Sequence, residues 1–266
     1  MTSLLDTITQ LSHEFGSDEY VKAGGGNTSC KTDDTLWVKP SGTTLAALTP
    51  QGFVALDRAR LADLYTAQTP DDAAAREELV KNMMAAAVKP ETPGRASVEA
   101  PLHDSLAARF VVHTHPMAVN GMTCAVGGSV AAARLFPDAL WVPYTDPGYT
   151  LCMAVREAIR EYRARQGCEP ALIFLENHGV FVSGDTADEV RATYVRVMQA
   201  LADAYAAAGV DAAVPEGPAP EAARVAAWHG VLAEALGADA GAVAAAGCFE
   251  VGDGPISPDH IVYAKS

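Results

Sequence analysis

The alternation of apolar and polar positions predicts helices and strands in turn along the chain. Apolar residues at helical spacing, such as Leu4, Ile8 and Leu11, predict amphipathic helices. With capping signals, the helices expected cover residues 4–15, 49–65, 71–88, 97–109, 116–122, 153–165, 185–208 and 221–236. Short apolar runs rich in β-branched and aromatic residues predict strands over residues 35–39, 110–115, 139–144 and 171–175. The chain is therefore of the α/β class.

Two histidines end the predicted strand that begins at Phe110. Side chains alternate across a strand, so His113 and His115, two residues apart, leave the same face. Such a pair suits a metal ion, although a histidine at a strand end is often only hydrogen-bonded. His178 follows the most apolar strand of the chain, at 171–175. Three histidines with one open position are typical of a catalytic zinc site.

Two glycine-containing stretches predict turns that face an anion. In residues 24–31, three glycines precede Asn27, and backbone N–H groups in such a stretch can approach an anion closely. Residues 40–44 form a second small polar turn, with Lys39 beside it. Each stretch alone is equally compatible with an ordinary flexible turn.

Composition and charge exclude several classes of protein. The 266 residues are 49% hydrophobic and 20% charged, which is typical of a globular protein. The net charge of −14 argues against a nucleic-acid partner, because phosphate backbones are held by clustered Lys and Arg. No leader pattern and no long apolar run appear, so we expect a cytoplasmic location without membrane contact. The five irregularly spaced cysteines predict reduced thiols rather than disulfides.

We expect one main domain over residues 1–208. Residues 209–266 are predicted to add a helix and a tail that pack on the same domain or on a neighbouring subunit. His229 and His260 lie in this part and could reach the site. Two other histidines are assigned to helices without a metal role: His13 and His103.

The order of five short motifs resembles the class II aldolase/adducin family over roughly residues 5–205. The motifs are Gly-Gly-Gly-Asn-Thr-Ser, Lys-Pro-Ser-Gly, Ser-Val-Glu, His-Thr-His-Pro and Asn-His-Gly. Trp37–Lys39, Pro143–Tyr149 and Ser257–His260 are most similar to the aldolase part of rhamnulose-1-phosphate aldolase/dehydrogenase-type proteins, and the chain also resembles fuculose-phosphate aldolase. The resemblance implies a three-layer α/β/α fold with a mostly antiparallel central sheet, assembled as a homotetramer with active sites at subunit interfaces.

For the metal and the chemistry, the resemblance implies five residues. His113, His115 and His178 would hold Zn²⁺ or another divalent metal such as Mn²⁺ or Co²⁺. Glu99 matches the acid/base glutamate of the family. Tyr144 matches a tyrosine that donates a proton from a neighbouring subunit, with buried packing as the alternative reading.

For the substrate, the resemblance implies a phosphate site. The matching positions, with Lys39 beside them, are Gly26, Asn27, Ser41, Gly42 and Ser97. Val98 stands where the family often has a second serine, so one hydroxyl donor is missing. Backbone N–H groups, Lys39 or Arg95 would replace it, or the substrate is not phosphorylated.

The function implied is that of a metal-dependent aldolase acting on a sugar phosphate. It would cleave or form a ketose 1-phosphate or deoxyketose 1-phosphate, to or from dihydroxyacetone phosphate and an aldehyde, through an enediolate that the metal stabilises. A 4-epimerase or a 3-oxo sugar-acid phosphate decarboxylase of the same family would use the same residues. A non-catalytic adducin-like module would be expected to have lost them, yet the three histidines and Glu99 are all present.

Overall fold

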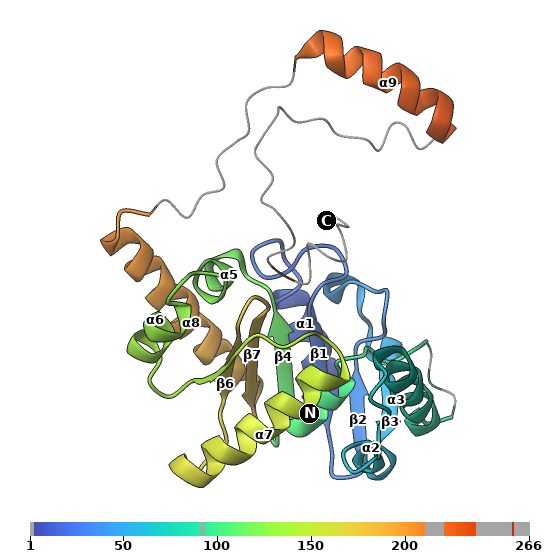
Figure 1. The fold of residues 1–266 in the computed structure, drawn as a ribbon, viewed down its shortest axis with the longest axis vertical. Helices are drawn as coiled ribbons and strands as arrows, with labels where there is room; N and C mark the ends of the chain where they lie inside the picture. The colour runs from blue at the N-terminus through green and yellow to red at the C-terminus, as the bar shows by residue number, and fades with distance from the viewer. Residues whose placement is uncertain (1–2, 91, 93, 211–220, 238–256, 258–266) are drawn as a thin grey trace.

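A computed structural model describes residues 3–90, 92, 94–210, 221–237 and 257 (Figure 1). In these residues, seven strands form one sheet in the order β3-β2-β1-β4-β7-β6-β5. The strands are β1 (Asn27–Lys31), β2 (Thr35–Val38), β3 (Val54–Asp57), β4 (Phe110–Thr114), β5 (Leu140–Val142), β6 (Leu172–Leu175) and β7 (Gly179–Gly184). Only β5 and β6 pair in parallel. The mostly antiparallel sheet is therefore confirmed.

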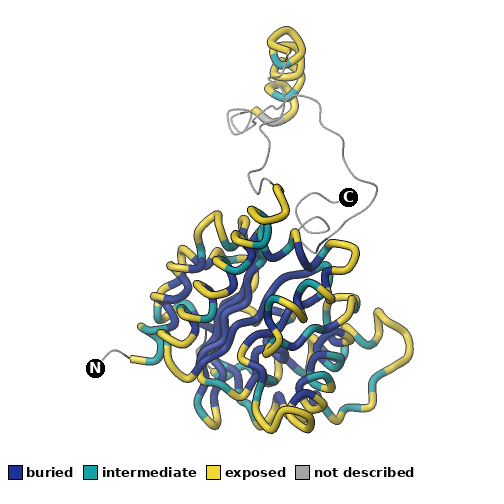
Figure 2. The backbone as a smooth tube through the Cα atoms, turned by 90° about the vertical axis from the view of Figure 1, so that its left-hand side faces the viewer, coloured by how far each residue is buried: buried dark blue, intermediate teal, exposed yellow. Residues whose placement is uncertain are grey.

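Helices cover both faces of the sheet, so the strands are buried in the middle of the fold (Figure 2). The helices are α1 (Leu4–Glu14), α2 (Arg58–Leu64), α3 (Ala73–Ala87), α4 (Ala100–Ser105), α5 (Met117–Thr123), α6 (Gly128–Leu135), α7 (Tyr149–Gln166), α8 (Ala187–Ala207) and α9 (Ala222–Leu236). One apolar core joins the sheet to α1, α5, α6 and α8. Two others join it to α2, α3, α4 and α7. The three-layer α/β/α architecture is confirmed.

The strand β4 lies at the centre of the sheet and contributes to both layers. Val112 packs in the core beneath α1 and α8, whereas Val111 packs with α4 and α7. Because side chains alternate along a strand, His113 faces the same side as Val111. The histidine pair is therefore on the α4 side of the sheet.

The prediction of one continuous helix over residues 49–65 is wrong. A short 3₁₀ turn at Pro50–Gly52 is followed by β3, which pairs with β2, and only then by α2. The Asp57 side chain accepts hydrogen bonds from the N–H groups of Ala59 and Arg60, so the helix starts there. The Thr-Pro pair marks only the short turn.

Two expectations near the predicted site are also corrected. Residues 27–31 form the buried strand β1, where a loop was expected. The helix expected over 97–109 is limited to α4, Ala100–Ser105. Ser97 does not cap that helix; Glu99 occupies the cap position and makes no side-chain cap. Two elements had no sequence prediction: α6 and β7.

The helix α9 lies apart from the sheet in Figure 1. Its described side chains are exposed or half-buried, including the exposed Trp228 and His229. His260 lies outside the described residues, and of its tail motif Ser257 is described and buried. The packing of residues 209–266 thus stays a prediction. None of the helices described has the length and apolar character needed to cross a lipid bilayer.

Candidate metal and substrate site

Three histidine side chains converge at one end of the sheet. His113 is in β4, His115 follows it, and His178 stands in the turn between β6 and β7. Their candidate ligand atoms all lie within 4.8 Å of one another, and the Nε2 atoms of His113 and His115 are 2.9 Å apart. The pairing of β4 with β7 brings the two parts of the chain together. The prediction that His113 and His115 share a face is confirmed.

Close contacts fix the His113 ring and the start of β7. His113 Nδ1 lies 3.0 Å from the carbonyl oxygen of Val180. A carbonyl only accepts, so Nδ1 donates to it, and Nε2 is the nitrogen that faces the other histidines and would bind a metal. The ring stacks on Phe181 with centroids 4.0 Å apart. A Cβ atom at Gly179 would lie 2.5 Å from the carbonyl oxygen of Thr114, so only glycine lets β7 start this close to β4.

This donor set fits a divalent metal. Imidazole nitrogens on a tetrahedral ion stand about 3.3 Å apart, given metal–nitrogen distances of about 2.0–2.1 Å. The atoms observed, within 4.8 Å of one another, need only small movements to reach that geometry. Three nitrogen donors suit zinc and its borderline neighbours better than magnesium or calcium.

Glu99 lies beside the histidines. Its Oε1 lies 3.5 Å from His113 Nε2 and 3.3 Å from His178 Nε2. Burial alone would raise the pKa of the Glu99 carboxyl, but the two imidazoles together hold it well below its usual range. The carboxylate is therefore ionised at neutral pH and can accept a proton.

Asn27 connects Glu99 to the glycine stretch. Its amide donates to Ser97 Oγ at 3.0 Å and also to Glu99 Oε2. The Glu99 N–H donates to the same serine oxygen at 3.2 Å. Gly26 has φ +70°, and a Cβ there would lie 2.8 Å from the carbonyl oxygen of His113. The structure thus brings Gly26, Asn27, Ser97 and Glu99 into one cluster next to β4.

Lys39 links the two predicted loops from inside the protein. The side chain is buried, and Nζ donates to the carbonyl oxygens of Gly24 at 3.1 Å and Thr43 at 2.8 Å. Burial lowers the pKa of Lys39 to about 8, against the attraction of Glu99. These two hydrogen bonds hold the two loops together, and the role of Lys39 as a replacement for the missing hydroxyl donor stays a prediction.

The outer turn offers different donors. Ser41 and Gly42 are exposed, and a Cβ at Gly42 would meet no atom within 4 Å. Arg95 is also exposed, and its Nη2 donates to Ser41 Oγ at 3.3 Å. Val98 is 63% exposed and offers no side-chain donor. Arg95 is therefore at the surface, whereas Lys39 is buried.

Among the described residues, no contact brings Tyr144 to the histidines. It follows β5, is 54% exposed, and its hydroxyl donates to Asp146 Oδ1 at 3.0 Å. That hydrogen bond raises the pKa of the tyrosine. Its N–H donates to Glu176, two residues before His178. The alternative interpretation, that Tyr144 is a buried packing residue within the single chain, is therefore wrong.

The sequence match agrees with this geometry. Residues 6–205 match the family of class II aldolase and adducin N-terminal domains. The chain belongs to the class II aldolase/adducin family. Membership of this family supports the prediction that the protein is a lyase-type enzyme. The histidine cluster thus lies within the part of the chain that matches a recognised family.

Individual relatives agree on the fold. The N-terminal class II aldolase domain of a conserved protein from Thermoplasma acidophilum is 27% identical, with a TM-score of 0.64, over 76% of this chain and 94% of that one. A sugar-phosphate aldolase from Thermotoga maritima is 14% identical, with a TM-score of 0.52, over 78% of this chain and 97% of that one, and supports the fold alone.

A curated relative is much longer than this chain. The Bacillus subtilis (strain 168) protein YuxG, named as an uncharacterized oxidoreductase, is 30% identical over 207 residues. The match covers 73% of this chain but 28% of YuxG. The name of that protein therefore refers to a molecule of which this chain matches about a quarter.

Proposed function

We propose that the protein is a zinc-dependent class II aldolase. It cleaves or forms a ketose 1-phosphate or deoxyketose 1-phosphate, to or from dihydroxyacetone phosphate and an aldehyde. The observation that carries the proposal is the position of the ionised Glu99 carboxylate, 3.3 to 3.5 Å from two nitrogens of the histidine cluster. A proton acceptor and a metal site thus meet at one point.

Each residue has a part in this chemistry. His113, His115 and His178 would hold the ion, with Val180 fixing the ring of His113. The ion, when bound, supplies a Lewis acid that polarises the substrate carbonyl and stabilises the enediolate charge. Asn27 holds one oxygen of Glu99, which leaves the other oxygen directed at the histidines.

Glu99 moves the proton in both directions of the reaction. In cleavage, its carboxylate takes the proton of the C4 hydroxyl, the C3–C4 bond breaks, and its electrons pass into the enediolate as the aldehyde leaves. Protonation of the enediolate at carbon then gives dihydroxyacetone phosphate. In synthesis, Glu99 removes a proton from the hydroxymethyl carbon of dihydroxyacetone phosphate.

The phosphate is assigned to the turn that carries Ser41 and Gly42. Arg95 supplies the charge there, because its guanidinium already contacts Ser41 at the surface. A local cation is needed, since the chain as a whole carries −14 charges. Lys39 and Ser97 support the loop and Asn27 from inside.

The remaining parts of the proposal concern assembly. We propose a cytoplasmic homotetramer in which Tyr144 donates a proton in the site of a neighbouring subunit. The exposed position of its hydroxyl supports such a role, because a buried tyrosine would be unable to reach another chain.

An aldol assay tests the proposal. The zinc-loaded protein is supplied with dihydroxyacetone phosphate and a panel of small aldehydes, with Glu99→Gln as the matched variant. We expect carbon–carbon bond formation that requires zinc and is lost in the variant. If the metal binds and no product forms with any aldehyde, the aldolase proposal fails, and the epimerase and decarboxylase reactions become the ones to assay.

A further inference from the structure

Glu99 is carried by a helix too short to hold its own position. α4 spans only six residues, Ala100–Ser105, with Glu99 at its N-terminal cap. Isolated helices shorter than about 12 residues are marginal in water. Contacts from the rest of the fold must therefore fix α4, and with it the carboxylate.

Lys31 holds the C-terminal end of this helix. Its side chain is 4% exposed, and Nζ donates to the carbonyl oxygen of His103 at 2.5 Å and to that of Leu106. The last carbonyls of a helix lack partners within the helix and carry partial negative charge. One buried amino group thus satisfies two of them through its N–H donors, which makes Lys31 a C-terminal anchor for α4.

One face of β1 follows α4 from end to end. Residues two apart on a strand share a face, which puts Asn27, Ser29 and Lys31 in a row. Asn27 donates to Glu99 at the start of the helix, and Ser29 Oγ lies 2.8 Å from His103 Nδ1 in its middle. Since β1 also pairs with the metal strand β4, one strand sets the distance between helix and metal site.

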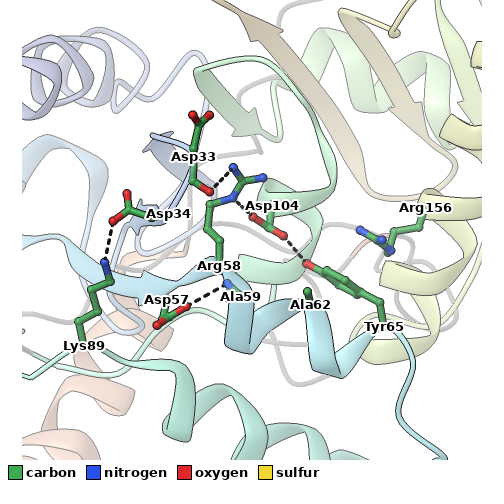
Figure 3. Close-up of a pocket in the computed structure, with 10 residues that line it drawn as sticks. All are labelled: Asp33, Asp34, Asp57, Arg58, Ala59, Ala62, Tyr65, Lys89, Asp104 and Arg156. Atoms are coloured by element: carbon green, nitrogen blue, oxygen red, sulfur yellow. Dashed lines mark hydrogen bonds and ion pairs between the residues drawn. The ribbon is translucent and has the colours of Figure 1, made fainter.

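The outer side of α4 is held by a second set of polar contacts (Figure 3). Asp104 accepts from Arg58 at 2.5 Å and from the Tyr65 hydroxyl at 2.9 Å. Arg156 lies over the Tyr65 ring at 3.4 Å and donates to Ser105 at 3.0 Å. These contacts bind the helix to its neighbours, and Arg58 also donates to the carbonyl oxygen of Thr32, directly after β1, at 2.9 Å. Lys31 differs from them in that it belongs to β1 itself and binds the last carbonyls of α4.

We propose that Lys31 is a positioning residue for the reaction: by anchoring the C-terminal end of α4, it fixes the Glu99 carboxylate against His113 and His178. This inference rests on the proposed role of Glu99. Lys31 acts through the helix, which rises about 1.5 Å per residue, so its contacts stand only about 6 to 10 Å from Glu99. A misplacement of about 1 Å in a catalytic group can cost on the order of 100-fold in rate.

The test compares Lys31→Met with Lys89→Met. Lys89 is a partly buried lysine that contacts Asp34 and Thr35 and has no contact with α4 among those described. We expect Lys31→Met to lower kcat by about 10- to 100-fold, with KM and zinc affinity unchanged. Lys89→Met should keep the wild-type kcat. A purely structural role of Lys31 would lower thermal stability without this separation of kcat from KM.

A second readout does not depend on catalysis. The Asn27 side-chain amide donates to Ser97 and Glu99, so its NMR signal, assigned with Asn27→Ala, reports where Glu99 lies. We expect the signal to move in Lys31→Met and to stay in Lys89→Met, in the metal-free protein. If the wild type shows no aldolase activity, this signal alone decides the positioning role, and only the proposed function fails.

One further variant keeps the inference falsifiable if Lys31→Met does not fold. Lys31→Arg keeps N–H donors at this position, but its larger head group must push the end of α4 outward. We expect a lower kcat and a displaced Asn27 signal in this variant also. Wild-type kcat together with an unmoved Asn27 signal, in whichever Lys31 variant folds, would overturn the proposal.

Discussion

Two buried lysines make the stability of the protein rise with pH above neutrality. Burial lowers the pKa of Lys31 to about 7 and that of Lys39 to about 8, from 10.5 in the unfolded chain. Between pH 7 and 8.5 the unfolded chain therefore holds protons that the folded chain is releasing. The state that binds more protons is disfavoured as pH rises, so folding is favoured.

The size of the effect follows from these values. One fully released proton is worth about 1.4 kcal/mol per pH unit. Over this window Lys31 contributes on the order of 1 to 2 kcal/mol and Lys39 on the order of 1 kcal/mol. The buried thiols of Cys30 and Cys152 oppose the trend, since burial raises their pKa from 9.0 to about 12. They act mainly above pH 9, where unfolded thiols ionise.

Denaturant unfolding of the metal-free protein at pH 7.0 and 8.5 measures the effect. Chelation removes metal binding, which has its own pH dependence through the histidine ligands. We expect the free energy of unfolding to rise by about 2 kcal/mol in the wild type, by the same amount in Lys89→Met, and by less than half in Lys31→Met. A flat or falling wild-type profile, or a full rise in Lys31→Met, would refute the reasoning.

Three further predictions address the site. Gly26→Ala should lower the free energy of unfolding by about 2 to 4 kcal/mol, because strain at φ +70° adds to a close contact with the metal strand. Gly42→Ala, at φ +83° in open space, should lose only about 1 to 2 kcal/mol, and equal losses would contradict the role of the contact. Arg95→Met should raise KM for a phosphorylated ketose by about 10- to 100-fold and leave an unphosphorylated analogue unaffected. The exposed Arg134→Met is its control, and an equal effect on both substrates would remove Arg95 from the phosphate site. His178→Ala should weaken zinc binding by at least about 100-fold in competition with a coloured chelator, and unchanged affinity would exclude it as a ligand.

The histidine cluster could be predicted because part of its pattern is local. The spacing of His113 and His115 places both rings on one face of a strand whatever the rest of the fold does. His178 could be recognised as a candidate from its place after an apolar strand. The meeting of the three depends on the pairing of β4 with β7, and β7 itself was not predicted.

The elements around Glu99 could not be read from local signals. β1 has polar side chains at Asn27, Ser29 and Lys31, which the sequence presents as a loop. Their partners are more than 70 residues away, in and before α4, and only those contacts make a buried polar strand stable. The error over residues 49–65 has the same origin, because β3 forms through its pairing with β2.

The proton transfer assigned to Glu99 is the central claim, and hydrogen exchange at carbon tests it most directly. Dihydroxyacetone phosphate is incubated in deuterated water with the protein, without an aldehyde, and deuterium at the hydroxymethyl carbon is followed by NMR. We expect exchange with the zinc-loaded wild type, none with the metal-free protein, and none with zinc-loaded Glu99→Gln. Exchange that persists in Glu99→Gln, or its absence from a wild type that binds zinc and dihydroxyacetone phosphate, would contradict the account.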